Sequence, residues 1–590
     1  MDKPGIINLC KELGCCDACC LRFIGLKNPK IYESPGNFVL QFQSAKNTDD
    51  SQKTIEELKS EDQISQDDET NKNQNGIADV ANYEAKDVDC ADLKDSQPDV
   101  LKDNSIALNK ISTEDSSNKI VEENSKDSES PPAKRCKLNV CASCLGVLQE
   151  DLWAESFTTV KEVLDKKGYE CTTFACGLSS PIAIILREKA IVLRIVDKFP
   201  GFDGNNVTPL KEAWKWSFAT RMAANINKVL DSGAVSPLLI TLNYDYPDDL
   251  QELEILKTIS PKLFQTRSQQ RRRYTTEFTR RSVEQALENV TLPSMVEAGG
   301  GLPLATTTAK CVSVVCTHSP IYLAGRYLKL SRNLPQTPWV LEGRRVLPSS
   351  VQEIIFKPIA DIYKLTQEEA EQRLKFVAAG REDVDVRCLG EGRPFAIEIT
   401  DPRRQLTPEE LARACEEIEK SGEVVVKSMV PIEREDLTEL KKGEETKSKT
   451  YEAICIKLTH SKYDDVSPDA PIRVTKEDLQ RINEFRNTPE GDPIKIKITQ
   501  KTPIRVLHRR PLLTRTRGIL ELNAYEVPEH QHLFRIVVTT TAGTYVKEWA
   551  CGELGRTAPA LAAPLAARAA LLALDVAAVT LRWPPALPST

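Results

Sequence analysis

Short apolar runs bounded by turn-forming residues recur through the C-terminal part of the chain, over residues 319–590. Helical signals lie between them: Ser350 and Glu353 form a capping box, and Thr407 opens a helix that Gly422 can end. The strand-like runs are RPFAIEIT (393–400), EVVVKSMVPI (423–432), KTYEAICIKL (449–458), PIKIKIT (493–499), TRGILELNAY (516–525) and HLFRIVVTT (532–540). Strands with interspersed helices predict an α+β domain with a mixed, mostly antiparallel sheet.

The preceding region, up to residue 318, mixes helical and strand-like patterns. LKEAWKWSFATRMAANINKVL (210–230) has apolar residues at helical spacing and carries Trp214 and Trp216. The runs that predict strands are KAIVLRIVDKF (189–199) and PLLITLNYDY (237–246), and CVSVVCTHSPIYLAG (311–325) predicts a buried strand.

One segment of this region combines arginines with aromatic residues. Arg267, Arg271, Arg272, Arg273, Arg280 and Arg281 surround Tyr274 and Phe278. Guanidinium groups bind phosphates, and aromatic rings stack on bases. A solvated helix face explains the same pattern equally well.

The charge is unevenly distributed. The chain has 79 basic and 86 acidic residues, for a formal net charge of −7, which as an average argues against a nucleic-acid partner. Residues 45–130, however, hold 23 acidic and 10 basic residues and one aromatic residue, Tyr83, so the rest of the chain has a net charge of +6. An acidic, aromatic-poor stretch buries too little apolar surface to offset its ordering entropy, and we expect it to be disordered. The protein around it is mildly basic.

The N-terminal residues MDKPGIINLCKELG contain no apolar run typical of a signal peptide. We expect no membrane span either, because the Ala/Leu-rich stretch 560–579 is interrupted by Pro564, Arg568 and Asp575. The 17 cysteines therefore indicate reduced thiols or metal ligation rather than disulfides.

Two Cys-x-x-Cys turns predict a structural zinc site. Zinc takes four ligands at tetrahedral corners, and each turn presents two thiolates. Cys141 and Cys144 form one turn, and Cys16 with Cys19 is our choice for the other, although Cys15 or Cys20 could substitute. Unrelated free cysteines are the alternative. The long insertion between the turns costs only logarithmically in closure entropy.

A short basic cluster precedes the second turn. Lys134, Arg135 and Lys137, in PPAKRCKLN, resemble a nuclear-import signal, and a solvated charge cluster is the alternative. We expect the protein in the nucleus and the cytoplasm.

Familiar catalytic motifs are missing from the sequence. The five histidines form no metal-binding helix motif, and the glycines at 299–301 lack the Lys-Ser/Thr of a phosphate-binding loop, so nucleotide hydrolysis is unsupported. The conspicuous polar clusters are GRYLKLSRNLPQTPW (325–339), GREDVDVRCLGEGRPF (380–395), KTYEA (449–453), QKTPIRVLHRRP (500–511) and GTYVKEWACGELGRT (543–557).

The motif GREDVDVR, together with AGRYLKLSRNLPQTPW, TPIRVLHRRP and GTYVKE, resembles the archaeal and eukaryotic tRNA pseudouridine synthases that modify T-loop uridines at tRNA positions 54 and 55. The resemblance is dense over 319–557, weaker over 139–318, and restricted to the cysteine pairs before that. It implies an α/β THUMP-containing accessory domain with a structural zinc site, joined to a pseudouridine synthase catalytic domain with the mostly antiparallel sheet. We accordingly divide the chain into a first zinc half-site (1–44), an acidic insert ending in the basic motif (45–138), a second zinc half-site with the THUMP-containing domain (139–318), and the catalytic domain (319–590).

The resemblance also implies the catalytic residues. The family's indispensable aspartate, a nucleophile or a base toward the ribose, falls on Asp383 in GREDVDVR, and Asp385 is the neighbour that could be mistaken for it. A catalytic aspartate covered by RNA needs an opposite charge nearby to stay ionised. Lys547 of GTYVKE matches the family's basic partner, while Arg381 and Arg387 could serve locally.

The target uridine must leave its stack, so we expect an aromatic and apolar pocket. Tyr451 matches the family's base-stacking tyrosine, and Tyr545 matches a second substrate-contacting position. Val546 and Leu574 match apolar pocket positions, although the Ala-rich surroundings of Leu574 depart from the family pattern. His508, Arg509 and Arg510 either hold RNA phosphate or line the domain floor.

The partner implied by this resemblance is tRNA, held by its T-arm, with Trp214, Trp216 and Arg271–Arg273 gripping the acceptor end. The reaction needs no organic cofactor, and we expect a monomer that does not bind membranes. The alternative function is a structured-RNA-binding protein that acts on primary microRNA and its processing complex independently of catalysis. The intact Asp383 and Lys547 pair favours the enzyme.

Overall fold

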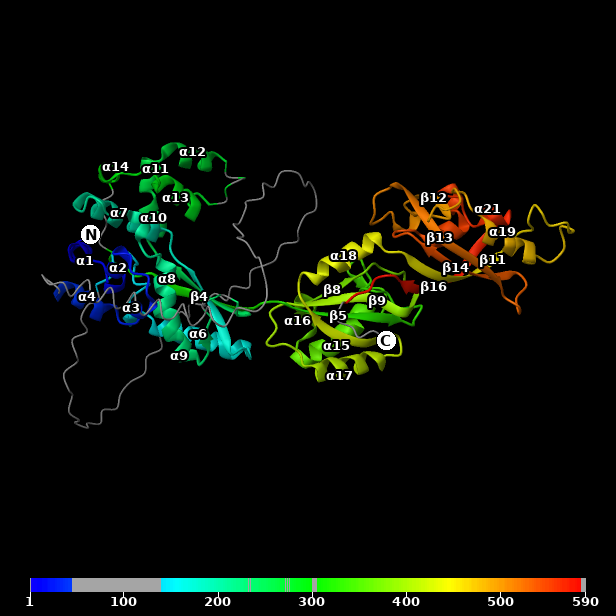
Figure 1. Cartoon of the computed structure of the whole chain (residues 1–590), viewed down its shortest axis with the longest axis horizontal. Coiled ribbons are helices and arrows are strands. Elements are labelled where there is room, and N and C mark those ends of the chain that lie inside the picture. The colour runs from blue at the N-terminus through cyan, green and yellow to red at the C-terminus, as the bar shows by residue number, and fades with distance from the viewer. Residues whose placement is uncertain are drawn as a thin grey trace, which may run out of the picture.

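The computed structural model describes residues 2–44 and 139–584, except 232, 234, 271, 273, 275 and 300–304, and it leaves the side chains of 443–446 undescribed. The acidic insert, its basic motif at Lys134–Lys137, and Arg271 and Arg273 therefore lie outside the described residues. The described chain forms an N-terminal lobe and a C-terminal lobe (Figure 1).

The first 44 residues form four short helices that belong to the N-terminal lobe. They are α1 (Lys3–Glu12), α2 (Asp17–Phe23), α3 (Pro29–Glu33) and α4 (Pro35–Ser44). Asp2 caps α1 by accepting a hydrogen bond from the backbone N–H of Gly5. Apolar residues such as Ile6 and Leu21 are fully buried in the same core as Phe174 and Trp214, so these helices fold onto the accessory domain.

The accessory domain has a four-stranded sheet in the order β2-β1-β3-β4. β1 is parallel to β2 and to β3, and β3 is antiparallel to β4. The strands are β1 (Thr173–Ser179), β2 (Val229–Leu230), β3 (Leu238–Asp245) and β4 (Lys310–His318). The helical segments are η1 (Glu150–Leu152), α6 (Ala154–Lys167), α7 (Ala183–Lys198), η2 (Gly204–Asn206), α8 (Leu210–Trp214), η3 (Lys215–Ala219), α9 (Thr220–Ile226), α10 (Asp249–Leu253), α11 (Ile255–Ile259), α12 (Pro261–Gln269), α13 (Arg280–Leu287) and α14 (Leu292–Glu297).

The strand predicted over 189–199 is wrong, because these residues form the second half of helix α7. The apolar residues Ile184, Ile191 and Ile195 are all buried, and they recur at the spacing of one helix face. The strand over 237–246 is confirmed as β3, and the helix over 210–230 runs as α8, a π-helical turn and α9 up to Ile226. The prediction of one buried strand over 311–325 is wrong, because β4 ends at His318 and most of its residues are exposed or half-buried.

The C-terminal lobe is built on a sheet of ten strands in the order β10-β5-β9-β16-β11-β14-β13-β12-β15, with β8 paired to β9. β9 and β16 are parallel, and the other pairs are antiparallel. The strands are β5 (Ile321–Lys329), β8 (Leu374–Ala378), β9 (Arg387–Ile399), β10 (Val424–Ile432), β11 (Lys449–Lys457), β12 (Ile496–Lys501), β13 (Thr514–Glu526), β14 (Leu533–Thr540), β15 (Thr557–Ala558) and β16 (Ala569–Val579), with a separate hairpin of β6 (Val340–Leu341) and β7 (Arg344–Arg345). The prediction of a mixed, mostly antiparallel sheet is confirmed.

Helices cover the two halves of this sheet separately (Figure 1). One half packs on α15 (Val351–Tyr363), α16 (Gln367–Arg373), α17 (Pro408–Glu419) and α18 (Asp436–Thr446), and the other lies near α19 (Lys476–Glu484), η4 (Ile504–Val506), α20 (Val546–Cys551), η5 (Glu553–Gly555) and α21 (Ala562–Leu565). The predicted caps are present, since the side chains of Ser350 and Thr407 accept the backbone N–H of Glu353 and Glu410. The parallel pair β9–β16 joins the two halves, so the loop before β9 lies at their junction.

Asp401 connects the two lobes just beyond the end of β9. Its carboxylate accepts hydrogen bonds from the Tyr169 hydroxyl (2.5 Å) and the His318 backbone N–H (2.8 Å), and it pairs with Lys167 (2.7 Å). Its φ of +53° is a left-handed conformation that non-glycine residues seldom adopt. Glu170 also bonds Arg403 and Arg404, so the turn that follows β9 contacts the N-terminal lobe at several residues.

None of the helices in the described part of the chain combines the length and the apolar character needed to cross a membrane.

Candidate active site and cysteine centre

The loop 379–386, between β8 and β9, carries Asp383 and Asp385. The buried side chain of Lys329 holds the backbone of this loop in place. The Lys329 ammonium donates hydrogen bonds to the carbonyl oxygens of Asp383 (3.0 Å), Val384 (2.7 Å) and Leu334 (2.7 Å). Burial lowers the pKa of Lys329 to about 8, although nearby carboxylates act against this shift. The lysine at the end of β5 therefore fixes the backbone of the candidate catalytic aspartate.

A second buried residue, Glu382, anchors the same loop. Its fully buried carboxylate accepts hydrogen bonds from Arg393 Nε (2.8 Å) and from the Tyr327 hydroxyl (2.8 and 3.0 Å). Gln336 donates to the Tyr327 hydroxyl (2.8 Å) and to the Gly380 carbonyl oxygen (2.9 Å), and Arg393 reaches a further loop carbonyl (2.8 Å). Each buried charge has a partner, so the network rigidifies the loop.

Two cations reach Asp383 from the other half of the sheet. Arg505 Nη1 lies 2.9 Å from the Asp383 carboxylate, and Lys547 Nζ lies 3.4 Å from it. Lys547 is closer to the Asp385 carboxylate, at 2.6 and 2.7 Å. The Asp383 side chain is 30% exposed and that of Asp385 is 65% exposed, so Asp383 is the more sheltered of the two.

These cations shape the electrostatics of the site. Partial burial raises the pKa of Asp385, but the hydrogen bond and charge of Lys547 outweigh it and the net pKa lies below the ordinary value. Burial lowers the pKa of Arg505, but the carboxylates of Glu548 and Asp383 raise it above the ordinary value. Glu548 also binds Arg505 Nε at 2.6 Å, which aims the guanidinium at Asp383.

Arg505 is the residue that sequence reasoning missed. It lies inside the matched cluster TPIRVLHRRP, among three further basic residues, and no spacing separates it from them. The 3₁₀ turn Ile504–Val506 decides its direction.

Of the two local candidates for a charge partner, Arg387 is engaged elsewhere, while Arg381 feels the charges of Glu382 and Asp383. Arg387 pairs with Asp575 (2.6 Å), which also binds Arg332 (2.7 Å). Burial and the neighbouring Arg509 lower the pKa of Arg381. Arg332 instead donates to the Asp385 carbonyl oxygen (3.0 Å), so it adds a further brace to the loop.

The predicted pocket residues gather around this site. Val546 and Leu574 are buried in one apolar cluster, and Tyr451 packs against it. Ala453 pairs with Leu574 and Tyr451 with Val576 on the neighbouring strands β11 and β16. Burial raises the pKa of Tyr451 to about 12, and the Asp383 carboxylate is among the charges acting on it.

Tyr545 is half-buried at the start of α20, two residues before Lys547. Its backbone N–H and carbonyl group both bond the side chain of Gln500 (2.9 and 3.0 Å), which is buried. His508, Arg509 and Arg510 are exposed on the same loop as Arg505.

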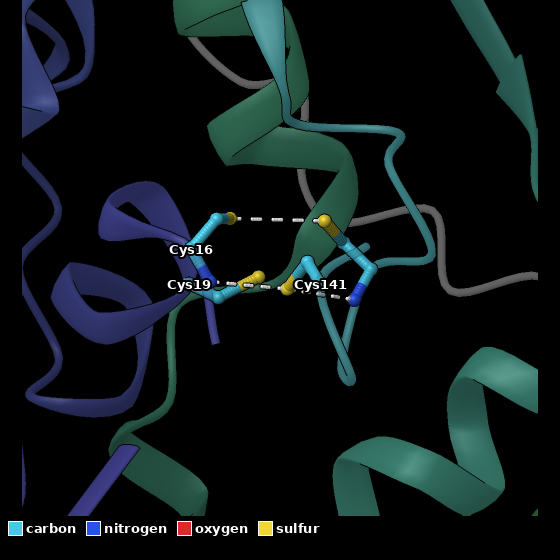
Figure 2. Close-up of side chains that lie close together, drawn as sticks. Cys16, Cys19 and Cys141 are labelled. Atoms are coloured by element: carbon cyan, nitrogen blue, oxygen red, sulfur yellow. Dashed lines mark hydrogen bonds between the residues drawn. The ribbon is translucent and has the colours of Figure 1, made fainter. Parts of the chain in front are cut away.

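The four predicted metal ligands come together in the N-terminal lobe. The sulfur atoms of Cys16, Cys19, Cys141 and Cys144 all lie within 4.8 Å of one another, although more than 120 residues separate the two pairs (Figure 2). Four sulfurs bound to zinc at 2.3 Å in a tetrahedron stand about 3.8 Å apart. The Cys16 and Cys144 sulfurs are 3.8 Å apart, so the donors fit this ion.

The surroundings also suit thiolate ligands. The backbone N–H groups of Cys16 and Cys144 donate to the Cys141 sulfur at 3.2 and 3.5 Å, and the fully buried Arg22 donates to the Cys19 sulfur at 3.8 Å. Such outer hydrogen bonds stabilise the charge of metal-bound thiolates. The alternative ligand Cys20 instead donates to the carbonyl oxygen of Cys15 (3.9 Å).

Comparisons with known proteins give the family. Residues 322–580 match the family described as "Pus10, C-terminal", and residues 141–313 match "Eukaryotic Pus10, N-terminal". The tRNA pseudouridine synthase Pus10 of Homo sapiens is 33% identical over 468 residues, which is 78% of this chain and 81% of the human protein. This chain belongs to the Pus10 family.

It is a eukaryotic-type Pus10 pseudouridine synthase, and hence an isomerase. The Pus10 of Methanocaldococcus jannaschii is 33% identical over 271 residues, which is 44% of this chain and 52% of the archaeal protein. Among solved structures, a Cbf5-Nop10-Gar1 complex covers 42% of this chain and 56% of that chain at 16% identity, with a TM-score of 0.21. That likeness is too slight to carry an argument.

The accessory domain of this Pus10 does not present all of the predicted RNA-contacting residues. Trp214 is fully buried and stacks on Phe218 at 4.9 Å, and Trp216 is partly buried against Tyr32 at 5.4 Å. Phe278 is buried in a separate core cluster. The prediction that Trp214 grips the acceptor end is therefore wrong, because its ring belongs to the core.

Proposed function

We propose that this Pus10 protein converts uridine to pseudouridine in the T-loop of tRNA, at position 54, position 55 or both. The reaction breaks the bond between N1 and C1′ and joins C5 to C1′. The proton lost from C5 is balanced by the proton that N1 carries in the product, so no cofactor is consumed. Asp383 acts on the ribose as nucleophile or base.

The observation that carries this proposal is the setting of Asp383. Its carboxylate is rigidly placed by the loop network and lies within reach of Arg505 and Lys547. Two neighbouring cations favour the ionised carboxylate when RNA displaces water from the site. Asp385 is more exposed and is occupied by Lys547 at 2.6 Å, which supports Asp383 as the reacting group.

The aromatic and apolar side chains near Asp383 suit a base that has left its stack. In this proposal Tyr451 stacks on the uracil, with Val546 and Leu574 as apolar walls and Tyr545 as a further contact. All four residues lie on β11, β16 or the start of α20. An aromatic and apolar lining compensates for the stacking that the flipped base loses.

The cysteine centre has a different role in this proposal. Zinc held by Cys16, Cys19, Cys141 and Cys144 would supply folding free energy, since four protein ligands leave no open position for chemistry. The accessory domain would hold the tRNA by its shape and backbone charge.

The proposal is tested with an unmodified tRNA transcript and site-by-site mapping of pseudouridine. The unaltered protein should modify the T-loop, while Asp383→Asn should bind the tRNA and leave no detectable pseudouridine. Asp361→Asn is the matched control, because Asp361 is exposed and, among the residues that the structure describes, its carboxylate pairs only with Lys357 one helical turn away. T-loop modification by the Asp383→Asn protein would contradict the assignment.

A further inference from the structure

A basic hollow adjoins the candidate active site, and the reaction itself leaves it unused. It has a volume of about 60 Å³ and is lined by Arg510, Arg515, Arg517, Gly543 and Tyr545, together with Gln500, Thr502, Pro511 and Leu513. A single water needs about 10–15 Å³ by the same measure, so the hollow holds a group several times larger. We propose that it binds one backbone phosphate of the substrate RNA, next to the uridine that reacts.

The charges of the hollow are unbalanced. In the part of the chain that the structure describes, no carboxylate lies within 4.0 Å of the guanidinium nitrogens of Arg510, Arg515 or Arg517. Burial and the neighbouring Arg515 lower the pKa of Arg517, as expected where like charges crowd together. Three guanidinium groups without a counter-charge around a concave surface form a site for an anion, and planar guanidinium groups match the oxygens of phosphate.

Hydrogen bonds and a glycine fix the positions of the residues that line the hollow. Arg517 Nε donates to the Gly543 carbonyl oxygen at 3.2 Å, and a Cβ atom on Gly543 would lie 2.9 Å from Arg517 Nη2. Glycine at this position, with φ of +72°, therefore leaves room for the guanidinium. The Thr502 side chain bonds Pro511 and Leu513 at 2.8 and 3.0 Å, which closes the loop that carries Arg510.

The hollow shares two elements with the catalytic site. The loop from Thr502 to Leu513 presents Arg505 to Asp383 and Arg510 to the hollow. Tyr545 lines the hollow and directly precedes Val546 and Lys547. A phosphate bound here would lie beside the proposed stacking pocket, and this inference rests on the proposed RNA substrate.

The test uses synthetic T-arm hairpins in which one phosphate at a time is replaced by a neutral methylphosphonate. Binding is measured with Asp383→Asn protein, so catalysis does not enter. One replacement near the target uridine should weaken binding about tenfold, because it removes a charged hydrogen-bonded contact. The same replacement should have a much smaller effect when Arg510→Gln and Arg515→Gln are added, since two of the three guanidinium partners are already missing.

The control is Arg568→Gln, which removes an exposed arginine directly before β16 that does not line the hollow, and it should leave the methylphosphonate pattern unchanged. Arg515→Gln alone repeats the test if the double variant is poorly folded. The proposal is overturned if every sensitive phosphate remains equally sensitive in the arginine variants. If the hollow binds its phosphate but the active protein forms no pseudouridine, the phosphate site stands and the proposed reaction fails.

Discussion

The loop 379–386 and the cysteine centre hold their functional side chains in position by opposite means. Around Asp383, buried charges are matched by other protein groups: Glu382 by Arg393 at 2.8 Å, and the Lys329 ammonium by three carbonyl oxygens. In the cysteine centre, four thiols converge within 4.8 Å, and protein hydrogen bonds satisfy them only in part.

The difference shows what each region needs in order to fold. A network of internal partners forms as the chain folds, and it leaves the Asp383 carboxylate partly exposed. Four converging thiolates repel one another unless a cation lies between them, so their geometry depends on an ion taken up from solution. A substitution in one of these two regions should therefore leave the folding of the other region intact.

Loss of the metal should have the largest effect. Cys141→Ser, or a strong chelator, should unfold the N-terminal lobe, since structural zinc contributes about 10 kcal/mol or more to small domains. The catalytic lobe should keep its own unfolding transition, as followed by limited proteolysis and mass spectrometry. Cys551→Ser, at an exposed thiol, is the control. The zinc assignment would be contradicted if the folded protein contained no metal, or if Cys141→Ser were as stable as the unaltered protein.

Breaking the buried pair beneath Asp383 should come next. Arg393→Met leaves the fully buried Glu382 carboxylate without its counter-charge, which typically costs about 3–5 kcal/mol of unfolding free energy. Urea denaturation of the catalytic lobe measures the loss. Adding Glu382→Gln should recover part of it, because the uncompensated charge is then removed. A loss of unfolding free energy below about 1 kcal/mol would show that the pair of Glu382 and Arg393 does not anchor the loop 379–386.

Lys329 gives a smaller effect that depends on pH. Its pKa is lowered to about 8 in the folded protein, and the unfolded value is near 10.4. Between these values the unfolded chain binds the extra proton, so this group makes the folded protein more stable as pH rises from about 8 to 10. The stability difference between the unaltered protein and Lys329→Met should stay constant below pH 8 and grow in favour of lysine above it. A flat difference up to pH 10 would contradict this.

Asp385→Asn should have the smallest effect. The substitution frees Lys547, which lies 3.4 Å from Asp383, to pair with that carboxylate instead. Pseudouridine formation should stay within about tenfold of the unaltered protein, far from the loss expected for general acid–base or nucleophilic groups. Single-turnover rates with excess enzyme measure it. Equal inactivity of the Asp383→Asn and Asp385→Asn proteins would remove the distinction between the two aspartates.

The sheet of the catalytic lobe could largely be predicted from the sequence, because its strands are short apolar runs with clear turn signals. The runs at 423–432, 449–458 and 532–540 match β10, β11 and β14 closely. Helix α7 was not predictable in the same way. The run that predicted a strand starts at Lys189, in the middle of the helix, and its β-branched residues favour a strand. The spacing of the buried helix face becomes visible only when Ile184, which precedes the run, is included.

The candidate site was predictable in its residue types but not in its contacts. Tyr327, Lys329 and Gln336 stand within one matched motif, Glu382 stands within another, and Arg393 follows it in the same polar cluster. Sequence alone gives no reason to pair the two groups, because Tyr327 and Glu382 lie 55 residues apart in the chain and Lys329 and Asp383 lie 54 residues apart. The resemblance places these residues within family motifs, and the structure shows that they form the hydrogen-bond network that holds the loop 379–386.

The cysteine centre also has a consequence for the continuity of the chain. Cys19 and Cys141 flank the segment 45–138, so a bound ion would link residues on both sides of it as a removable crosslink. A protease cut anywhere within that segment would leave two polypeptides that still form one particle, held by the ion and by the buried faces of α1 and α2. The first 44 residues could then be supplied as a separate peptide and would rejoin the rest in the presence of metal. Covalent continuity between the two halves of the site is therefore dispensable once the lobe has formed.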